Sequence, residues 1–350
     1  MKSSLAPYRL RTQRLVGTPL GSPAEVVGHL GAVQSQLHDM ALWAIGRRCG
    51  ATQAEVEDAF ARGDFVRTHV LRPTWHDVLP ADLRDLLELT APRIRQAMAS
   101  NNRRDGLERD VIERWAERAI DAVREKGALT RLAVEEQLAE SGFRRQGNSL
   151  AHVMIEAELT GEIHSGPIRG KHHTYVAADL PPSRRTPDER LAWLAQTYGR
   201  GHGPFRAKDL AWWATLTLTQ ARRAIELAQL ETLELAGEDH HVTAALDESA
   251  VPRAMLLPAF DEFISYARDP DDYALVDGNV GIVMRAGGLL FVSGALAGSW
   301  TRALTSADVR ISIAATRPID RATAAAIHAE ADRFGAFVNR RVAVEMQALG

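Results

Sequence analysis

Apolar residues recur every three to four positions from Ser22 to Arg48, which is the spacing of one face of an α-helix. Ser22 is suited to cap such a helix, and Pro23 is suited to its first position. The segment therefore predicts one helix or two. Thr52 followed three residues later by Glu55 is the signature of a capping box, so a further helix is predicted from Gln53 to Arg62.

The next segment, Phe65 to Leu79, is rich in β-branched and aromatic residues and is interrupted once, at Pro73. This composition favours two short strands joined as a hairpin. The predicted order over the first hundred residues is helix, helix, strand and hairpin, which is the order of a winged helix.

The same order returns in the middle of the chain. Thr130 opens a helix that runs to Leu138, and a second helix opens at Asn148 or Ser149. Glu162 to His164 then leads into a strand, and His173 to Ala177 supplies the return strand. We therefore expect a second winged-helix unit here.

A third copy follows the proline-rich segment from Leu180 to Pro187, which is the best candidate for a linker. Helices are predicted from Arg206 to Trp213 and from Thr219 to Ala228, but the pattern reveals no hairpin after them. The three copies share a pattern more than residues, so they represent repeated architecture and not a sequence repeat.

Beyond Val251 the pattern changes to that of β-structure. Gly287-Gly288 joins two strand-like runs, and Val309 to Ala314 predicts another strand. Pro318 to Phe337 has helical spacing, and Val342 to Met346 is expected to return to the sheet. These elements predict a small closed sheet.

Together the patterns predict an α+β protein with tandem winged-helix (helix-turn-helix) units and a small C-terminal β-barrel-like domain with a helix. The expected boundaries are 1–100, 101–180, 181–250 and 251–350.

Composition changes this picture little. The 350 residues are 45% hydrophobic and 25% charged, as in an ordinary globular protein. A net charge of −3 argues mildly against nucleic-acid binding, because such proteins are often strongly basic. However, residues 1–50 hold six basic and two acidic side chains, a local charge of +4 that leaves −7 for the remainder. A basic face on an acidic body is compatible with a nucleic-acid partner.

The apolar runs are too short to cross a bilayer, which needs roughly 20 residues, and residues 1–10 do not resemble a secretory signal. The lone Cys49 has no partner for a disulfide or a zinc cluster, which fits a reducing compartment. We expect a cytoplasmic protein without membrane contact.

Four segments spread over nearly the whole chain carry a family resemblance: His29–Gln36, Val66–His76, Gly203–Phe205 with Asp209–Trp213, and Leu256–Asp261. They resemble the winged-helix DNA-binding and crosslink DNA glycosylase family, in the azinomycin-resistance (AlkZ-like) branch that carries a Gln-x-Gln motif on a helix. Gln34 and Gln36 match that motif. A related branch has Asp at the second position.

The resemblance implies a monofunctional DNA repair glycosylase, a hydrolase of N-glycosyl bonds that needs no metal or other cofactor. Its implied substrate is double-stranded DNA carrying N7- or N3-alkylated purines, with unhooking of interstrand crosslinks as an extension. No obligate protein partner is evident, so a monomer is expected, associated with the nucleoid when it is bound to DNA.

Gln34 and Gln36 are the candidate catalytic residues. An alkylated purine already carries positive charge and leaves readily, so the protein needs only to place a water and offset charge at the sugar with fixed dipoles. An amide can do both without ionising. On a straight helix, however, residues i and i+2 face different ways, so an irregular helix end or separate roles would be needed. The alternative is that the two glutamines are an ordinary polar pair on the solvated surface.

The motif departs from the better-known members at two positions. Ser35 stands where they have a hydrophobic residue, and Leu37 stands where an acidic residue is frequent. The departure bears on substrate range more than on fold.

Candidate DNA contacts lie on the two predicted hairpins. In the first hairpin they are Arg67, His69, Arg72 and His76, with Trp75 as active-site support. The alternative is a packed hairpin with Trp75 in the core and hydrogen-bonded histidines. In the second hairpin the candidates are Arg169, Lys171, His172 and His173, because a hairpin tip is normally exposed. The alternative there is a merely solvated turn.

Asp261 could orient water or support the site, but its apolar neighbours favour a structural role. The histidines lack the spacing of a zinc site, so no metal is expected. Two alternatives to the enzyme stay open: a non-enzymatic winged-helix DNA-binding protein or transcriptional regulator, and a diverged family member without activity.

Overall fold

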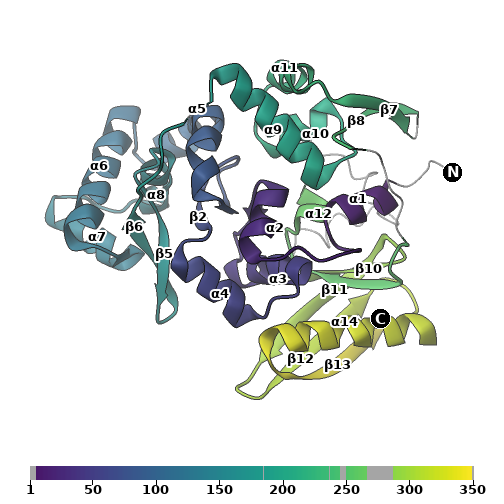
Figure 1. The fold of residues 1–350 in the computed structure, drawn as a ribbon. Helices are drawn as coiled ribbons and strands as arrows, with labels where there is room; N and C mark the ends of the chain where they lie inside the picture. Colours follow the sequence, from purple (N-terminus) through teal and green to yellow (C-terminus); the bar gives the residue numbers. More distant parts are fainter. Residues whose placement is uncertain (1–4, 184, 236, 245–249, 266–286, 349–350) are drawn as a thin grey trace.

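The computed structural model describes residues 5–183, 185–235, 237–244, 250–265 and 287–348. They form an α+β fold in which the C-terminal sheet and its helix lie at the bottom of Figure 1, and most helices of the preceding residues lie above and to the left of it. The strand-like run predicted before Gly287 falls within 266–286, outside the described residues.

The first unit has the predicted order, with one addition. Its elements are α2 (Pro23–Leu30), β1 (Val33–Gln34), α3 (His38–Cys49), α4 (Gln53–Arg62), β2 (Val66–His69) and β3 (Trp75–Val78). The addition is β1, which divides the segment from Ser22 to Arg48. Gly31 ends α2 with a φ of +79°, a conformation that favours glycine. The predicted capping box of Thr52 and Glu55 is present at the start of α4.

The second unit also follows the predicted order. Its elements are α6 (Arg109–Lys126), β4 (Leu129–Thr130), α7 (Arg131–Glu140), α8 (Ser149–Leu159), β5 (Ile163–Arg169) and β6 (His172–Ala177). The long helix α5 (Pro80–Arg104) joins it to the first unit. The two units share one six-stranded sheet, of order β1-β3-β2-β5-β6-β4, through an antiparallel contact between Arg67 and Ser165.

The third unit contains the hairpin that the sequence did not reveal. Helices α9 (Pro187–His202), α10 (Ala207–Trp213) and α11 (Leu218–Ala228) are followed by β7 (Glu231–Leu235) and β8 (Glu238–Val242). Phe205 forms an isolated bridge to His241, so a third strand position lies beside this hairpin.

The C-terminal region is a curled half-barrel and not a closed sheet. Among the described strands the order is β13-β12-β11-β10-β9, with β9 and β13 as the two edges. The elements are β9 (Ala254–Leu257), α12 (Glu262–Ser265), β10 (Gly288–Val292), β11 (Ala295–Leu304), β12 (Asp308–Ala315), α14 (Arg321–Val338) and β13 (Arg341–Ala348). The parallel pairing of β12 and β13 places α14 as a crossover between them.

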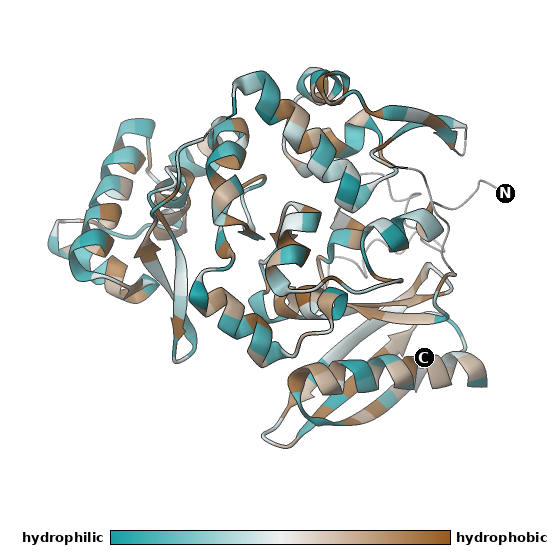
Figure 2. Ribbon diagram, in the orientation of Figure 1, coloured by the Kyte–Doolittle hydropathy of each residue, from teal (hydrophilic) through white to brown (hydrophobic). Residues whose placement is uncertain are grey.

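The hydrophobic core joins the first unit to this sheet. Trp43 of α3 packs edge-on against Phe334 of α14, with ring centroids 5.2 Å apart, and its indole N–H donates to the Leu256 carbonyl. The N-terminal helix α1 (Ala6–Thr12) packs on the sheet through Leu10. Strands β10 and β11 are largely hydrophobic in Figure 2, whereas the helices carry both classes of residue. The sheet therefore supports β1 and α3 from below.

Candidate active site

The Gln-x-Gln motif lies on an extended segment and not on a helix. Gln34 pairs with His76 across β1 and β3, and the Ser35 N–H continues the ladder by donating to the Trp75 carbonyl at 2.8 Å. Gln34 is half-buried, Ser35 is buried and Gln36 is exposed. Gln34 ends strand β1, and Gln36 lies in the bend before α3. The geometric objection to two residues i and i+2 on a straight helix therefore does not apply here.

The Gln34 side chain is oriented by a cation. Its Oε1 accepts a hydrogen bond from Arg72 Nη2 at 3.2 Å, and Arg72 Nη1 donates to the Trp213 carbonyl at 3.1 Å. Arg72 lies in the connection between β2 and β3 and contacts the third unit through that carbonyl. The amide of Gln34 is therefore held between two units of the fold.

Glu262 fixes the backbone beneath the motif, and sequence reasoning missed it. Its Oε1 accepts from the Gln34 N–H at 2.9 Å, and its Oε2 accepts from His202 Nε2 and Trp213 Nε1, both at 3.0 Å. The side chain is fully buried. Burial alone raises its pKa, but the hydrogen bond and charge of His202 and the charge of Arg72 outweigh burial and lower the pKa to about 2. An ionised carboxylate thus lies under the motif.

His76 is a neutral hydrogen-bond partner of Arg72. Its Nδ1 donates to the Thr74 carbonyl at 3.0 Å, which leaves Nε2 to accept from Arg72 Nη2 at 3.2 Å. Burial and the charge of Arg72 lower the pKa of His76 to about 3. The imidazole is therefore uncharged at ordinary pH and cannot serve as a cationic DNA contact.

The structure also keeps Arg67 and His69 from the surface. Arg67 Nε donates to the Ser35 carbonyl at 3.0 Å, and its guanidinium lies 4.3 Å from the centroid of the Trp75 ring. His69 is buried between Glu158 and Trp75. Arg67 is therefore buried, whereas a phosphate contact would need it at the surface, and His69 and His76, expected near the lesion, are buried as well. Trp75 is half-buried within the same group.

The second hairpin is exposed at its tip. Arg169, Lys171 and His172 are all exposed, and Arg169 Nη1 donates to the Ala128 carbonyl at 2.9 Å. His173 is different, because its ring packs against that of His38 with centroids 4.6 Å apart. Burial and the charge of Arg67 lower the pKa of His173 to about 4. The first three candidates of this hairpin are thus at the surface, whereas His173 packs inward.

Asp261 is the partner of a buried arginine. Its two carboxylate oxygens accept from Arg48 Nη2 at 2.8 Å and from Arg48 Nη1 at 2.9 Å, and neither side chain is exposed. Arg48 Nη2 also donates to Gln13 Oε1 at 2.8 Å. The carboxylate of Asp261 therefore ties α3 to the start of α12.

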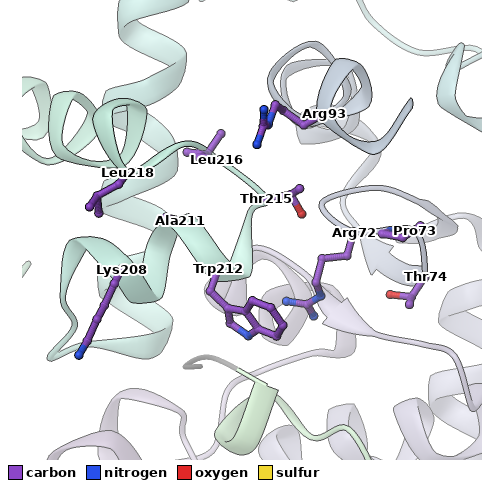
Figure 3. A pocket seen from close by; sticks show the side chains of 10 residues that line it. All are labelled: Arg72, Pro73, Thr74, Arg93, Lys208, Ala211, Trp212, Thr215, Leu216 and Leu218. Carbon is purple, nitrogen blue, oxygen red and sulfur yellow. The ribbon is translucent and has the colours of Figure 1, made fainter. Parts of the chain in front are cut away.

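A cavity of about 850 Å³ opens beside Arg72 (Figure 3). It lies between the tip of the first hairpin, helix α5 and the helices α10 and α11. Its lining residues are Arg72, Pro73, Thr74, Arg93, Lys208, Ala211, Trp212, Thr215, Leu216 and Leu218. The cavity and Gln34 share Arg72, so both belong to one region of the surface.

The described residues contain neither a metal-ligand cluster nor a membrane-spanning helix. Within them, His, Cys, Asp and Glu side chains form no group of three or more that could hold a metal ion. No helix in the same residues is long and apolar enough to span a membrane.

The chain is similar to a known family and to a solved structure. Residues 27–337 match the family model described as DNA glycosylase AlkZ-like. Among solved structures, the chain is similar to Streptomyces sahachiroi DNA glycosylase AlkZ, with 20% sequence identity and a TM-score of 0.80, covering 99% of this chain and 100% of that one. No curated protein sequence matches. Because the family model spans most of its length, the chain belongs to the AlkZ-like DNA glycosylase family.

Proposed function

We propose that the protein is a monofunctional DNA glycosylase that hydrolyses the N-glycosidic bond of N7- or N3-alkylated purines in duplex DNA. The observation that carries this proposal is the arrangement of Gln34, whose side-chain amide is bonded to Arg72 and whose backbone is bonded to the buried Glu262. Catalysis by dipoles requires groups that are held in place before the reaction. Gln34 is held both at its side chain and at its backbone.

Hydrolysis of the glycosidic bond needs only a departing purine, a placed water and groups that offset charge at the sugar. The bonding pair of the glycosidic bond leaves with the alkylated purine, which becomes neutral, and the sugar is left with oxocarbenium character. A water placed by Gln34 and Gln36 adds to the sugar carbon and loses its proton to solvent. The ionised Glu262 beneath β1 contributes negative potential at the site where positive charge develops. Unhooking a crosslink is the same cleavage at one of two joined bases.

The rest of the fold supplies the DNA-binding surface. The element order is that of winged helices. We propose that the three units correspond to residues 1–100, 101–180 and 181–250, ahead of a C-terminal β-domain at 251–350. The exposed tip of the second hairpin, with Arg169, Lys171 and His172, contacts phosphates. The protein works as a cytoplasmic monomer without metal or other cofactor.

Purified protein is expected to release 7-methylguanine from methylated duplex DNA, with equal activity in EDTA. Free base is measured by chromatography after incubation with enzyme in excess. Activity that EDTA abolishes and zinc restores would contradict the metal-independent mechanism. If no N7- or N3-alkylpurine is released, while the duplex is still bound, the regulator becomes the better explanation.

Binding to undamaged duplex is expected to weaken steeply with salt, because displaced counterions accompany each phosphate contact. Arg169→Ala with Lys171→Ala should flatten the slope of log K against log salt by about 1–2 units. Arg310→Ala with Arg341→Ala is the matched control, since these exposed arginines lie on the C-terminal sheet. A slope that the hairpin variant leaves unchanged removes this tip from the interface.

A further inference from the structure

The cavity beside Arg72 has two facing walls (Figure 3). One wall is the tip of the first hairpin, with Pro73 and Thr74, and the other comes from the third unit, with Trp212 and Leu218. Arg93 of α5 closes a third side. At about 850 Å³ the cavity falls in the range of small-molecule sites.

The third-unit wall carries unusual apolar exposure. Trp212 is 45% exposed and Leu218 is 42% exposed, and both line the same cavity. The neighbouring Trp213 is fully buried, so α10 directs one indole into the core and the other into the cavity. An exposed aromatic face in a concave site is suited to stacking on a flat ring.

The lining also contains hydrogen-bonding groups. Arg72, Arg93 and Lys208 line the cavity together with Thr74. Arginine and lysine nitrogens donate hydrogen bonds, and a threonine hydroxyl can donate or accept. A planar ring with donors and acceptors on its edge satisfies both features of the cavity, and a nucleobase is such a ring.

The position of the cavity relative to Gln34 indicates that its occupant is the base to be excised. Arg72 lines the cavity and donates to Gln34 Oε1 at 3.2 Å. A nucleotide with its base in the cavity therefore has its sugar on the side of Gln34. We propose that the cavity receives the damaged purine after it leaves the duplex stack, with the purine stacked on Trp212. This inference rests on the proposed function and specifies how that site holds its substrate.

The test separates base binding from base release. We expect the wild-type protein to bind a duplex with one unpaired adenine about tenfold more tightly than a fully paired duplex, because its base is free to enter the cavity. Trp212→Ala should lose this preference and slow single-turnover release of 7-methylguanine about tenfold. Trp212→Phe should retain most of both, since it keeps an aromatic face.

Trp193→Ala is the matched control. Trp193 belongs to the same unit but lies on α9 against Arg185, outside the cavity, so its variant should behave as wild type. The proposal is overturned if Trp212→Ala keeps the preference for the unpaired adenine, whether or not base release falls. A preference that depends on Trp212, in a protein that releases no alkylpurine, supports the base site and refutes the proposed function.

Discussion

Gln34→Ala is expected to lower single-turnover base release by about 10²–10³, with folding and duplex affinity nearly unchanged. In the proposed mechanism the amide stabilises positive charge that develops at the sugar as the purine departs, so its loss raises the barrier without changing the bound ground state. A factor of that size corresponds to roughly 3–4 kcal/mol of transition-state stabilisation. Gln53→Ala is the control, because Gln53 is also half-buried but bonds to Glu57 on α4.

Gln36→Ala should have a comparable effect, and the double variant should be little worse than the poorer single one. Two amides that place one water act as a unit, and the effects of such groups are not additive. Gln36→Asp should retain activity, since it introduces the carboxylate of the related branch. Wild-type release by both alanine variants would refute the catalytic assignment. A lowered melting temperature with wild-type chemistry would assign the motif a structural role instead.

Asp261→Ala should destabilise the fold by about 3–5 kcal/mol, because it leaves the guanidinium of Arg48 buried without its countercharge. The loss is measured as a fall in the midpoint of thermal or urea unfolding. Asp64→Ala is the matched control. It removes the ion pair between Arg62, whose side chain is 62% exposed, and Asp64, whose side chain is 38% exposed. The loss of folding free energy should be under about 1 kcal/mol.

The same variant decides between two roles for Asp261. Unchanged unfolding of Asp261→Ala together with slow base release would place this carboxylate in the active site. A folded fraction that retains wild-type release per molecule would confirm that the pair with Arg48 is structural.

Local signals predicted local structure well. Thr52 and Glu55 located the start of α4 because a capping box is complete within four residues. The composition from Phe65 to Leu79 likewise located both strands of the first hairpin. Strand β1 escaped prediction because two residues are too few to establish alternation, and its ladder partner on β3 lies about forty residues away.

The candidate site could likewise be predicted only where its residues are close in sequence. The motif identified Gln34 and Gln36, but Glu262 reaches Gln34 across 228 positions of sequence, and no spacing rule connects them. Its only signal was that it follows Asp261 at the end of an apolar run. The buried positions of Arg67 and His69 likewise depend on contacts with Ser165 and Glu158 of the second unit.

The shared sheet of the first two units has a consequence for how the protein reads DNA. The strand that carries Gln34 and the strands that carry the second hairpin tip belong to one hydrogen-bonded sheet, so the two ends keep a constant separation. Base pairs follow one another at about 3.4 Å along a duplex. Under the proposed function, this constant separation sets the number of base pairs between the phosphates bound by the tip and the excised purine, whatever the size of the alkyl group.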